Sequence, residues 1–135
     1  MDTFDRIQKM LNCKVWAVVG ASDNEDKYGF KILKMMRKAG YKVFAVNPGV
    51  EMILGEKCYA SLKDLPTKPD AVDFVVPPKV GEQIVAECAE LGIKNIWLQP
   101  GANSESVVAA ATAKELNVIH QSCVMVEIRK MDPYA

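Results

Sequence analysis

Short apolar runs alternate with longer segments of helical period along this chain, and that alternation constrains its fold more than any other feature of the sequence. The runs are rich in Val, Ile and Trp, and they are continuous, as in strands that are buried on both faces. In the segments between them, apolar residues recur every three or four positions. Because parallel strands need crossover helices, the pattern predicts an α/β fold with a parallel sheet between two helical layers.

Five main strands are expected. They cover residues 15–19, 43–46, 72–76, 96–98 and 118–119. Helices are expected in three of the four intervals between these strands, over about 29–39, 80–91 and 104–117. In the second of these helices one apolar stripe contains Val80, Ile84, Cys88 and Leu91. We therefore predict a Rossmann-like, doubly wound parallel sheet of about five strands with helices on both faces, in a single domain over residues 1–135.

Three further segments complete the expected organisation. Residues 50–70 supply or replace one edge of the sheet, with a short strand near Cys58 and a helical turn at 61–65. Residues 4–11 form a short amphipathic helix on the outside of the domain. The run 124–126 continues apolar beyond the last strand.

The charge balance excludes several classes of protein. The chain of 135 residues carries 17 Lys and Arg against 17 Asp and Glu, so it lacks the broad basic field of a nucleic-acid or anionic-membrane binder. No apolar run approaches the roughly 20 residues that span a bilayer, and the acidic N-terminus is not a secretory signal. We expect a cytoplasmic protein that binds neither nucleic acid nor membrane.

The cysteines agree with that compartment. Cys13, Cys58, Cys88 and Cys123 lie far apart, without a Cys-x-x-Cys pair, and the chain has one histidine, His120. A zinc site needs closely spaced thiolates or imidazoles, and a disulfide scaffold needs a shorter chain that is denser in cysteine. We expect reduced thiols that are buried or incidental, and no metal site.

Four of the expected strand ends share small, rigid and neutral residues. In a doubly wound sheet, ligands bind outside the carboxyl ends of the strands, near the point where the strand order reverses. Short neutral side chains there let a ligand approach the backbone and leave amide N–H groups free to donate. The four ends read Gly20-Ala21-Ser22, Asn47-Pro48-Gly49, Val76-Pro77-Pro78 and Gln99-Pro100-Gly101.

The first of these loops is the natural phosphate site. Backbone N–H groups after Gly20, the Ser22 hydroxyl and the positive end of the helix that starts near Gly29 all favour an anion. The loop is neither a P-loop nor a complete Gly-x-Gly-x-x-Gly fingerprint. Its acids must face solvent, cap the helix or be offset by Lys27 and Lys31. These acids are Asp23, Glu25 and Asp26.

The second strand end bears on the choice of nucleotide. An NAD site has an acid about 20 residues past the glycines, which accepts hydrogen bonds from the ribose hydroxyls. Here Asn47 and Pro48 stand in its place, and no acid lies between Gly40 and Val50. Because a neutral Asn does not repel a phosphorylated ribose, the sequence disfavours NAD and fits coenzyme A. NADP stays open, although no Arg stands beside Asn47 to hold its 2′-phosphate.

No catalytic residue is assigned. His120 and Cys123 lie near each other after the last expected strand, and such a pair can form a nucleophile. Residues three apart in an extended segment point to opposite faces, so these two side chains meet only across a turn. No pair of carboxylates is placed for acid–base chemistry.

Several motifs together resemble a known family. They are VWAVVGAS, KVFAVNPG, GEKCYASLKDLP, IKNIWLQPGA and SCVMVEI. Over about residues 10–128 the chain is similar to stand-alone CoA-binding proteins and to the N-terminal CoA-binding domain of the succinyl-CoA synthetase alpha subunit. That synthetase works through a phosphorylated histidine in a second domain, which His120 does not match. The resemblance therefore implies coenzyme A binding without ligase activity.

The resemblance also implies which residues contact each part of coenzyme A. They are Gly20, Ala21 and Ser22 with Lys27, Tyr28 and Gly29 for the diphosphate; Asn47 and Pro48 for the adenosine end; Val76, Pro77 and Pro78 for the adenine or the start of the pantetheine arm; and Gln99, Pro100 and Gly101 for the route of that arm.

Three functional hypotheses follow. The first is a module that binds CoA or an acyl-CoA as a non-catalytic carrier, sensor or partner subunit. The alternative is a small acyl-CoA transferase or a thiol-dependent enzyme that uses Cys123. The third is an interaction protein gated by its ligand, in which the N-terminal helix or the tail 129–135 docks a protein partner or a second copy of the chain as a homodimer.

Overall fold

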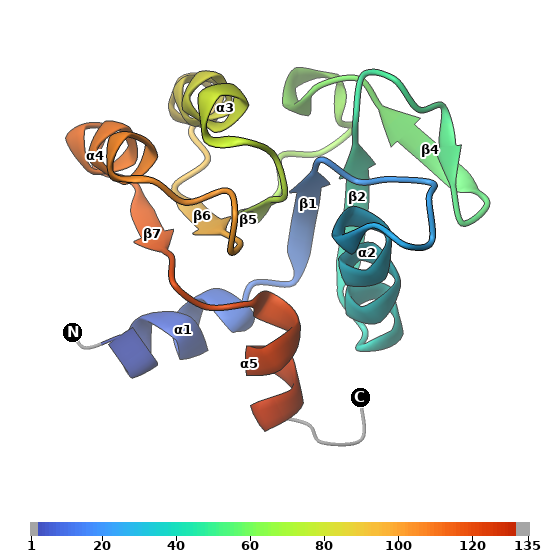
Figure 1. The fold of residues 1–135 in the computed structure, drawn as a ribbon, viewed down its shortest axis with the longest axis horizontal. Coiled ribbons are helices and arrows are strands. Elements are labelled where there is room, and N and C mark those ends of the chain that lie inside the picture. Colours follow the sequence, from blue (N-terminus) through green and yellow to red (C-terminus); the bar gives the residue numbers. More distant parts are fainter. Residues whose placement is uncertain (1–2, 132–135) are drawn as a thin grey trace.

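The computed structural model describes residues 3–131 and confirms the predicted α/β architecture. Its sheet has seven strands in the order β3-β4-β2-β1-β5-β6-β7 (Figure 1). Every neighbouring pair is parallel except β3 and β4. The strands are β1 (Val15–Val19), β2 (Lys42–Val46), β3 (Met52–Ile53), β4 (Glu56–Tyr59), β5 (Ala71–Phe74), β6 (Asn95–Leu98) and β7 (Asn117–Ile119). The last four residues of the tail, 132–135, lie outside the described residues.

The strand order locates the edge at which a ligand is expected. β1 lies in the middle, and the chain leaves it in two directions, first to β2 and β4 and then through β5 to β6 and β7. The carboxyl ends of β1 and β5 therefore flank the point where the order reverses, which is where open α/β sheets bind ligands. As expected, residues 50–70 supply an edge, through β4 and the short β3.

Helices cover both faces of the sheet (Figure 1). α1, α2 and α5 pack on the face to which Trp16 and Val18 of β1 point, and α3, α4 and the 3-10 turn η1 pack on the face of Ala17 and Val19. Because both faces are buried, β1 has to be apolar at nearly every position. The helical elements are α1 (Thr3–Leu11), α2 (Tyr28–Lys38), η1 (Leu62–Asp64), α3 (Pro78–Leu91), α4 (Glu105–Ala113) and α5 (Val124–Met131).

The last apolar run is a helix, which corrects the expectation that it continues the pattern of strand β7. α5 begins at Val124, and its buried residues include Val124, Met125 and Ile128. These positions are spaced for one face of a helix that packs on the sheet. Three apolar residues in a row carry no period of their own, so the run 124–126 was open to either structure.

The third strand and its helix also differ from the expected bounds. β5 ends at Phe74 instead of residue 76, and α3 begins at Pro78 instead of residue 80. Proline is favoured in the first turn of a helix because its missing N–H would have no partner there. Of the expected stripe, Cys88 is buried and Ile84 and Leu91 pack against the core, whereas Val80 is 41% exposed. The residues that α3 buries are Gly81, Val85 and Cys88.

The β3–β4 hairpin turns on two residues with left-handed backbone, Leu54 at φ 52° and Gly55 at φ 78°. Two positive φ values are typical of a type I′ turn, which favours Asn-Gly. Leucine is strained there because its Cβ crowds the following carbonyl. We predict that Leu54→Asn raises the free energy of unfolding in urea by about 0.5–1 kcal/mol. Leu54→Val, with a branched Cβ, should lower it, and equal stabilities of the two variants would contradict the turn type.

Three observations bear on membranes, metals and thiols. No helix within residues 3–131 is long and apolar enough to cross a bilayer. In that part of the chain, no three His, Cys, Asp or Glu side chains gather in a way that could hold a metal ion. The four cysteines are free thiols. Burial raises the pKa of the Cys88 thiol to about 12 and also raises the pKa of Cys58, so both resist ionisation at neutral pH.

Candidate functional site

Two glycines bring three elements together at the end of β1. Gly20 has φ +89°, and a Cβ on it would overlap the backbone carbonyl of Val75, which follows β5. Gly29, in the first turn of α2, lies against Gly20 in the same way, since its Cβ would overlap the Gly20 carbonyl. Without these side chains the backbone of β1 approaches both the end of β5 and the start of α2.

Two helices direct uncapped N-termini toward this edge. α2 follows Lys27 and α3 follows Pro77; neither of these N-cap side chains bonds to the first turn, and neither first turn contains an acid. α4 differs, because Ser104 Oγ accepts the Val107 N–H at 3.2 Å and Glu105 occupies its first turn. α2 and α3 therefore keep N–H groups and the positive end of the helix dipole available for an anion.

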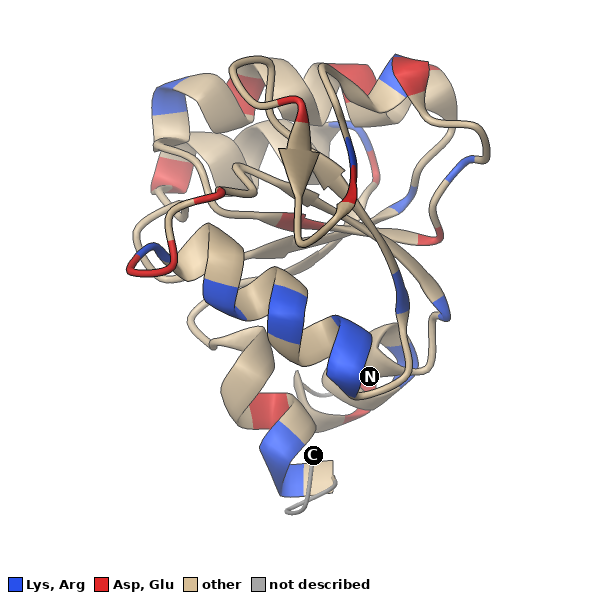
Figure 2. Cartoon of the chain, turned by 90° about the vertical axis from the view of Figure 1, so that its right-hand side faces the viewer, with Lys and Arg blue, Asp and Glu red and all other residues tan. Residues whose placement is uncertain are grey.

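The charged side chains of the β1–α2 loop face solvent. The exposed residues are Asp23, Glu25, Asp26 and Lys27. Figure 2 shows acidic positions on this loop and bands of Lys and Arg along α2. Within the loop, Ser22 Oγ accepts the Asn24 N–H at 3.0 Å. Tyr28 is also exposed, with Lys31 Nζ 5.7 Å from its ring centroid. Exposure to water screens the loop acids from an anion at the helix start.

Asn47 joins two of the strand ends. Its Nδ2 donates to the carbonyl of Ala21 at 2.8 Å, and its Oδ1 accepts the Gly49 N–H at 2.9 Å. A carboxylate could accept the bond from Gly49 but could not donate to Ala21. An acid here would therefore place a carboxylate oxygen next to the Ala21 carbonyl oxygen, with no hydrogen between them. The neutral residue that fits a phosphorylated ribose therefore also has a structural role.

A cleft of about 250 Å³ opens between the ends of β1 and β2 and the first half of α3. Most of its lining is apolar. It also contains the Glu87 carboxylate, which accepts the Leu62 N–H at 3.0 Å and so fixes the start of η1. The lining residues are Val19, Gly20, Val46, Asn47, Pro48, Ala60, Ser61, Leu62, Val76, Val80, Ile84 and Glu87.

Two further hollows extend the cleft along the same edge. One, of about 260 Å³, shares Val76 with the cleft. It is lined by Val75, Val76, Pro77, Pro78, Pro100, Gly101 and Ala102. The other, of about 660 Å³, shares Asn47 and Pro48 and extends over β4. Residues from all four expected strand ends thus line adjoining spaces.

The side chain of Gln99 is turned away from these spaces. It is 4% exposed, and both of its polar atoms bond to the start of α5. Its Oε1 accepts the Val124 N–H at 2.9 Å, and its Nε2 donates to Cys123 Sγ at 3.3 Å. Trp97 Nε1 adds a bond to the Ser122 carbonyl at 2.9 Å. Gln99 therefore caps α5, while its neighbours in the chain line the second hollow.

Comparison with known proteins decides the family. A family profile described as CoA binding domain matches residues 14–129. This chain belongs to the CoA-binding domain family. It is 35% identical over 105 residues to acetate--CoA ligase [ADP-forming] II of Archaeoglobus fulgidus, an alignment that covers 76% of the chain. The chain spans only 16% of that relative's length.

Two smaller proteins match this chain over most of their length. Uncharacterized protein YneT of Bacillus subtilis is 31% identical over 110 residues, which is 82% of each chain. The solved structure of a hypothetical protein from Pyrococcus horikoshii OT3 superposes with a TM-score of 0.89 at 30% identity. That superposition covers 96% of this chain and 92% of the other, and it confirms the predicted Rossmann-like fold.

This chain holds His120 and Cys123 in different surroundings. Cys123 is half-buried beside Gln99, whereas His120 lines a separate groove along β7. The turn between them contains Gln121 at φ 73°. No hydrogen bond joins the two side chains within the described residues, so the structure does not assemble a His/Cys pair.

Sequence reasoning missed one wall of the cleft. Leu62, Val80, Ile84 and Glu87 line it from η1 and α3. The helical spacing of Val80 and Ile84 was visible, but it was interpreted as a core stripe. Val80 lies in the first turn of α3 and is 41% exposed, so it lines the cleft and is not part of the core. The bond between Glu87 and Leu62 left no signal, because it joins residues 25 positions apart.

Proposed function

We propose that this chain binds coenzyme A or an acyl-CoA at the carboxyl ends of its strands and serves as a carrier, sensor or partner module without catalytic residues of its own. The observation that carries the proposal is an apolar cleft beside two uncapped helix N-termini, in a chain of the CoA-binding domain family. Relatives named acetate--CoA ligase support the choice of ligand.

The residues present fit the parts of such a ligand. The Gly20–Ser22 backbone and the start of α2 at Lys27–Gly29 suit the diphosphate, because they supply N–H donors and a positive dipole. The cleft beside Asn47 and Pro48 suits the adenosine end, since apolar walls can bury a flat ring. The hollow between residues 75–78 and 100–102 suits the pantetheine arm.

Ligand-induced stabilisation tests this proposal. A ligand that binds only the folded state raises its stability by RT ln(1 + [L]/Kd), about 2.7 kcal/mol at a hundredfold excess over Kd. We expect CoA to raise the melting temperature of the pure protein, dephospho-CoA to raise it less, and NAD to leave it unchanged. A shift with NAD and none with CoA would overturn the proposal.

The variant Val80→Glu locates the ligand. Val80 lines the cleft and is 41% exposed near the start of α3, where a carboxylate suits the helix dipole, so the variant should fold. Its charge should repel phosphate groups and weaken CoA binding about tenfold or more, measured by calorimetry. Val126→Glu, on α5 and 46% exposed, is the matched control and should bind like the wild type. Equal affinities of the two variants would place CoA elsewhere.

The contacts of Cys123 favour a second candidate, an acyl transferase. The Gln99 side chain donates from Nε2 to the Cys123 sulfur at 3.3 Å, and Cys123 directly precedes α5, which begins at Val124. The Cys123 sulfur would attack the thioester carbonyl of an acyl-CoA and form a new thioester, while the carbon–sulfur bond to CoA breaks and the leaving CoA sulfur takes up the proton that Cys123 loses. Intact-mass measurement after incubation with acetyl-CoA distinguishes the acyl transferase from the non-catalytic module. An acetyl adduct that Cys123→Ser abolishes supports the transferase, and bound but unreacted acetyl-CoA supports the module.

A further inference from the structure

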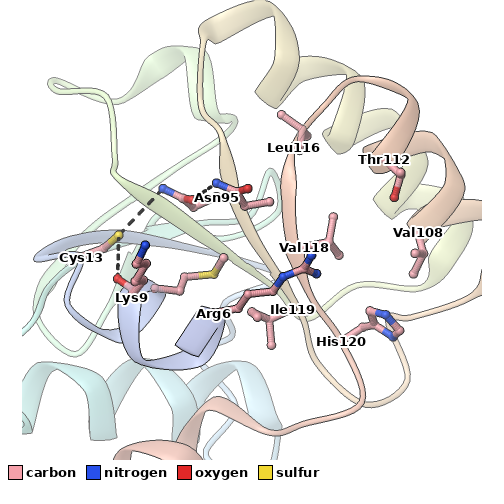
Figure 3. Close-up of a pocket in the computed structure, with 12 residues that line it drawn as sticks. Arg6, Lys9, Cys13, Asn95, Val108, Thr112, Leu116, Val118, Ile119 and His120 are labelled. Atoms are coloured by element: carbon pink, nitrogen blue, oxygen red, sulfur yellow. Dashed lines mark hydrogen bonds between the residues drawn. The ribbon is translucent and has the colours of Figure 1, made fainter. Parts of the chain in front are cut away.

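A separate groove runs along the outer side of the edge strand β7, between α1 and α4 (Figure 3). Its volume is about 590 Å³, and the described residues that line it include none that line the spaces at the carboxyl edge. We call it the β7 groove. It is bounded by Arg6 and Lys9 of α1, Val108 of α4, and Leu116, Val118 and His120 along the strand.

The groove exposes the unpaired side of a strand. Among residues 3–131, β7 pairs with β6 alone. The Asn117 N–H donates to the Lys94 carbonyl at 2.7 Å, so the backbone groups of Asn117 face β6. Successive residues of a parallel strand direct their N–H and C=O groups to opposite sides, and those of Val118 therefore face the groove. Such an edge is a template for one more strand.

The two walls of the groove differ in chemistry. α1 and α4 cover opposite faces of the sheet. The side chains of a strand added beside β7 would therefore point alternately toward α1 and toward α4. The α1 wall presents Arg6 and Lys9, both exposed, and Figure 3 shows Arg6 extending from α1 toward Val118. The α4 wall presents the partly buried Val108. No Asp or Glu is among the described residues that line the groove.

We propose that the β7 groove binds an extended segment of a partner protein in which acidic and apolar residues alternate, added as an eighth strand. Main-chain bonds to Val118 would supply affinity, the cations of α1 would select the acidic positions, and the α4 wall would select the apolar ones. A second copy of this chain is a poorer occupant, because pairing β7 with β7 would bring two sets of Arg6 and Lys9 together.

Peptide binding to the full chain tests the proposal. The probe is a short, end-capped peptide of alternating Glu and Val, labelled with fluorescein and followed by anisotropy. We expect the wild type to bind it, with an affinity that falls as salt rises. Arg6→Ala combined with Lys9→Ala should weaken binding about tenfold or more. The matched control, Lys34→Ala with Lys38→Ala on the exposed side of α2, removes the same charge and should bind like the wild type.

Val118→Pro tests the contribution of the backbone. It removes an N–H that faces the groove while leaving the bonds to β6 in place, as proline permits at a sheet edge. We expect circular dichroism like that of the wild type and loss of peptide binding. Three results would overturn the proposal: no binding of the Glu/Val peptide up to about 1 mM, equal binding of a Lys/Val peptide, or a dimer in size-exclusion chromatography that Val118→Pro abolishes.

Discussion

Gly20→Ala will lower the free energy of unfolding by about 3 kcal/mol or more. An alanine at φ +89° is strained in its own backbone, at a cost of about 1–3 kcal/mol. Its Cβ would also overlap the Val75 carbonyl, and that backbone has little room to move because the Val75 N–H donates to the Val19 carbonyl at 2.9 Å. Urea denaturation followed by circular dichroism measures the loss.

Gly40→Ala separates the two parts of this effect. Gly40 has φ +100° at the end of α2, and a Cβ there would meet no heavy atom within 4 Å. Its replacement should therefore cost only the backbone strain, about 1–2 kcal/mol. The difference between the variants measures the close approach of β1 to the end of β5. If Gly20→Ala were no more destabilising than Gly40→Ala, that approach would not exist in solution.

Asp73→Asn will remove a pH dependence of stability that the wild type shows. Asp73 lies in β5 between Val18 and Trp97, is 0% exposed, and has no hydrogen-bond partner for either carboxyl oxygen within residues 3–131. Burial raises the pKa of this carboxyl well above its ordinary value. Because the folded pKa is raised, the stabilisation from the bound proton is complete below the unfolded pKa, about 3.9. It is lost as pH rises through the folded pKa.

Between those two pKa values the wild type should lose about 1.4 kcal/mol of unfolding free energy per pH unit from this group. Asparagine has nearly the same shape and does not titrate, so the variant should lack that slope and be the more stable protein at high pH. Urea denaturation from about pH 5 to about pH 9 measures both. Asp26→Asn, on the exposed loop, makes the same charge change and should keep the wild-type slope. Parallel slopes for Asp73→Asn and the wild type would contradict the assignment.

The sheet was predictable where burial on both faces leaves a continuous apolar run, as at β1 and β2. The edge strand β4 was harder to predict. Its first residues, Glu56 and Lys57, are exposed and form no apolar run, and their pairing with β3 depends on the Leu54-Gly55 turn. α5 was missed for a physical reason as well. Its first turn is capped by Gln99, and a bond between positions 25 residues apart leaves no local pattern.

The backbone part of the candidate site could be predicted, because parallel strands bring their ends to one edge and small residues mark each end. The directions in which the side chains point could not be predicted from the sequence. Asn47 and Gln99 both follow strands, yet Asn47 lines the cleft and bonds to Ala21, whereas Gln99 turns to α5. Which neighbour an amide meets depends on loop geometry that residue spacing does not encode. The roles of these residues toward CoA stay predictions until the ligand experiments are done.

The bond between Trp97 and Ser122 has a practical consequence. Trp97 is fully buried, and its indole N–H holds the segment just before α5. Detachment of that helix would hydrate the indole and change its emission. The chain has two tryptophans, and the ring of Trp16 lies 6.4 Å from that of Trp97, so Trp16→Phe would leave Trp97 as the single tryptophan. The fluorescence of Trp97 would thus report whether α5 is packed on the sheet.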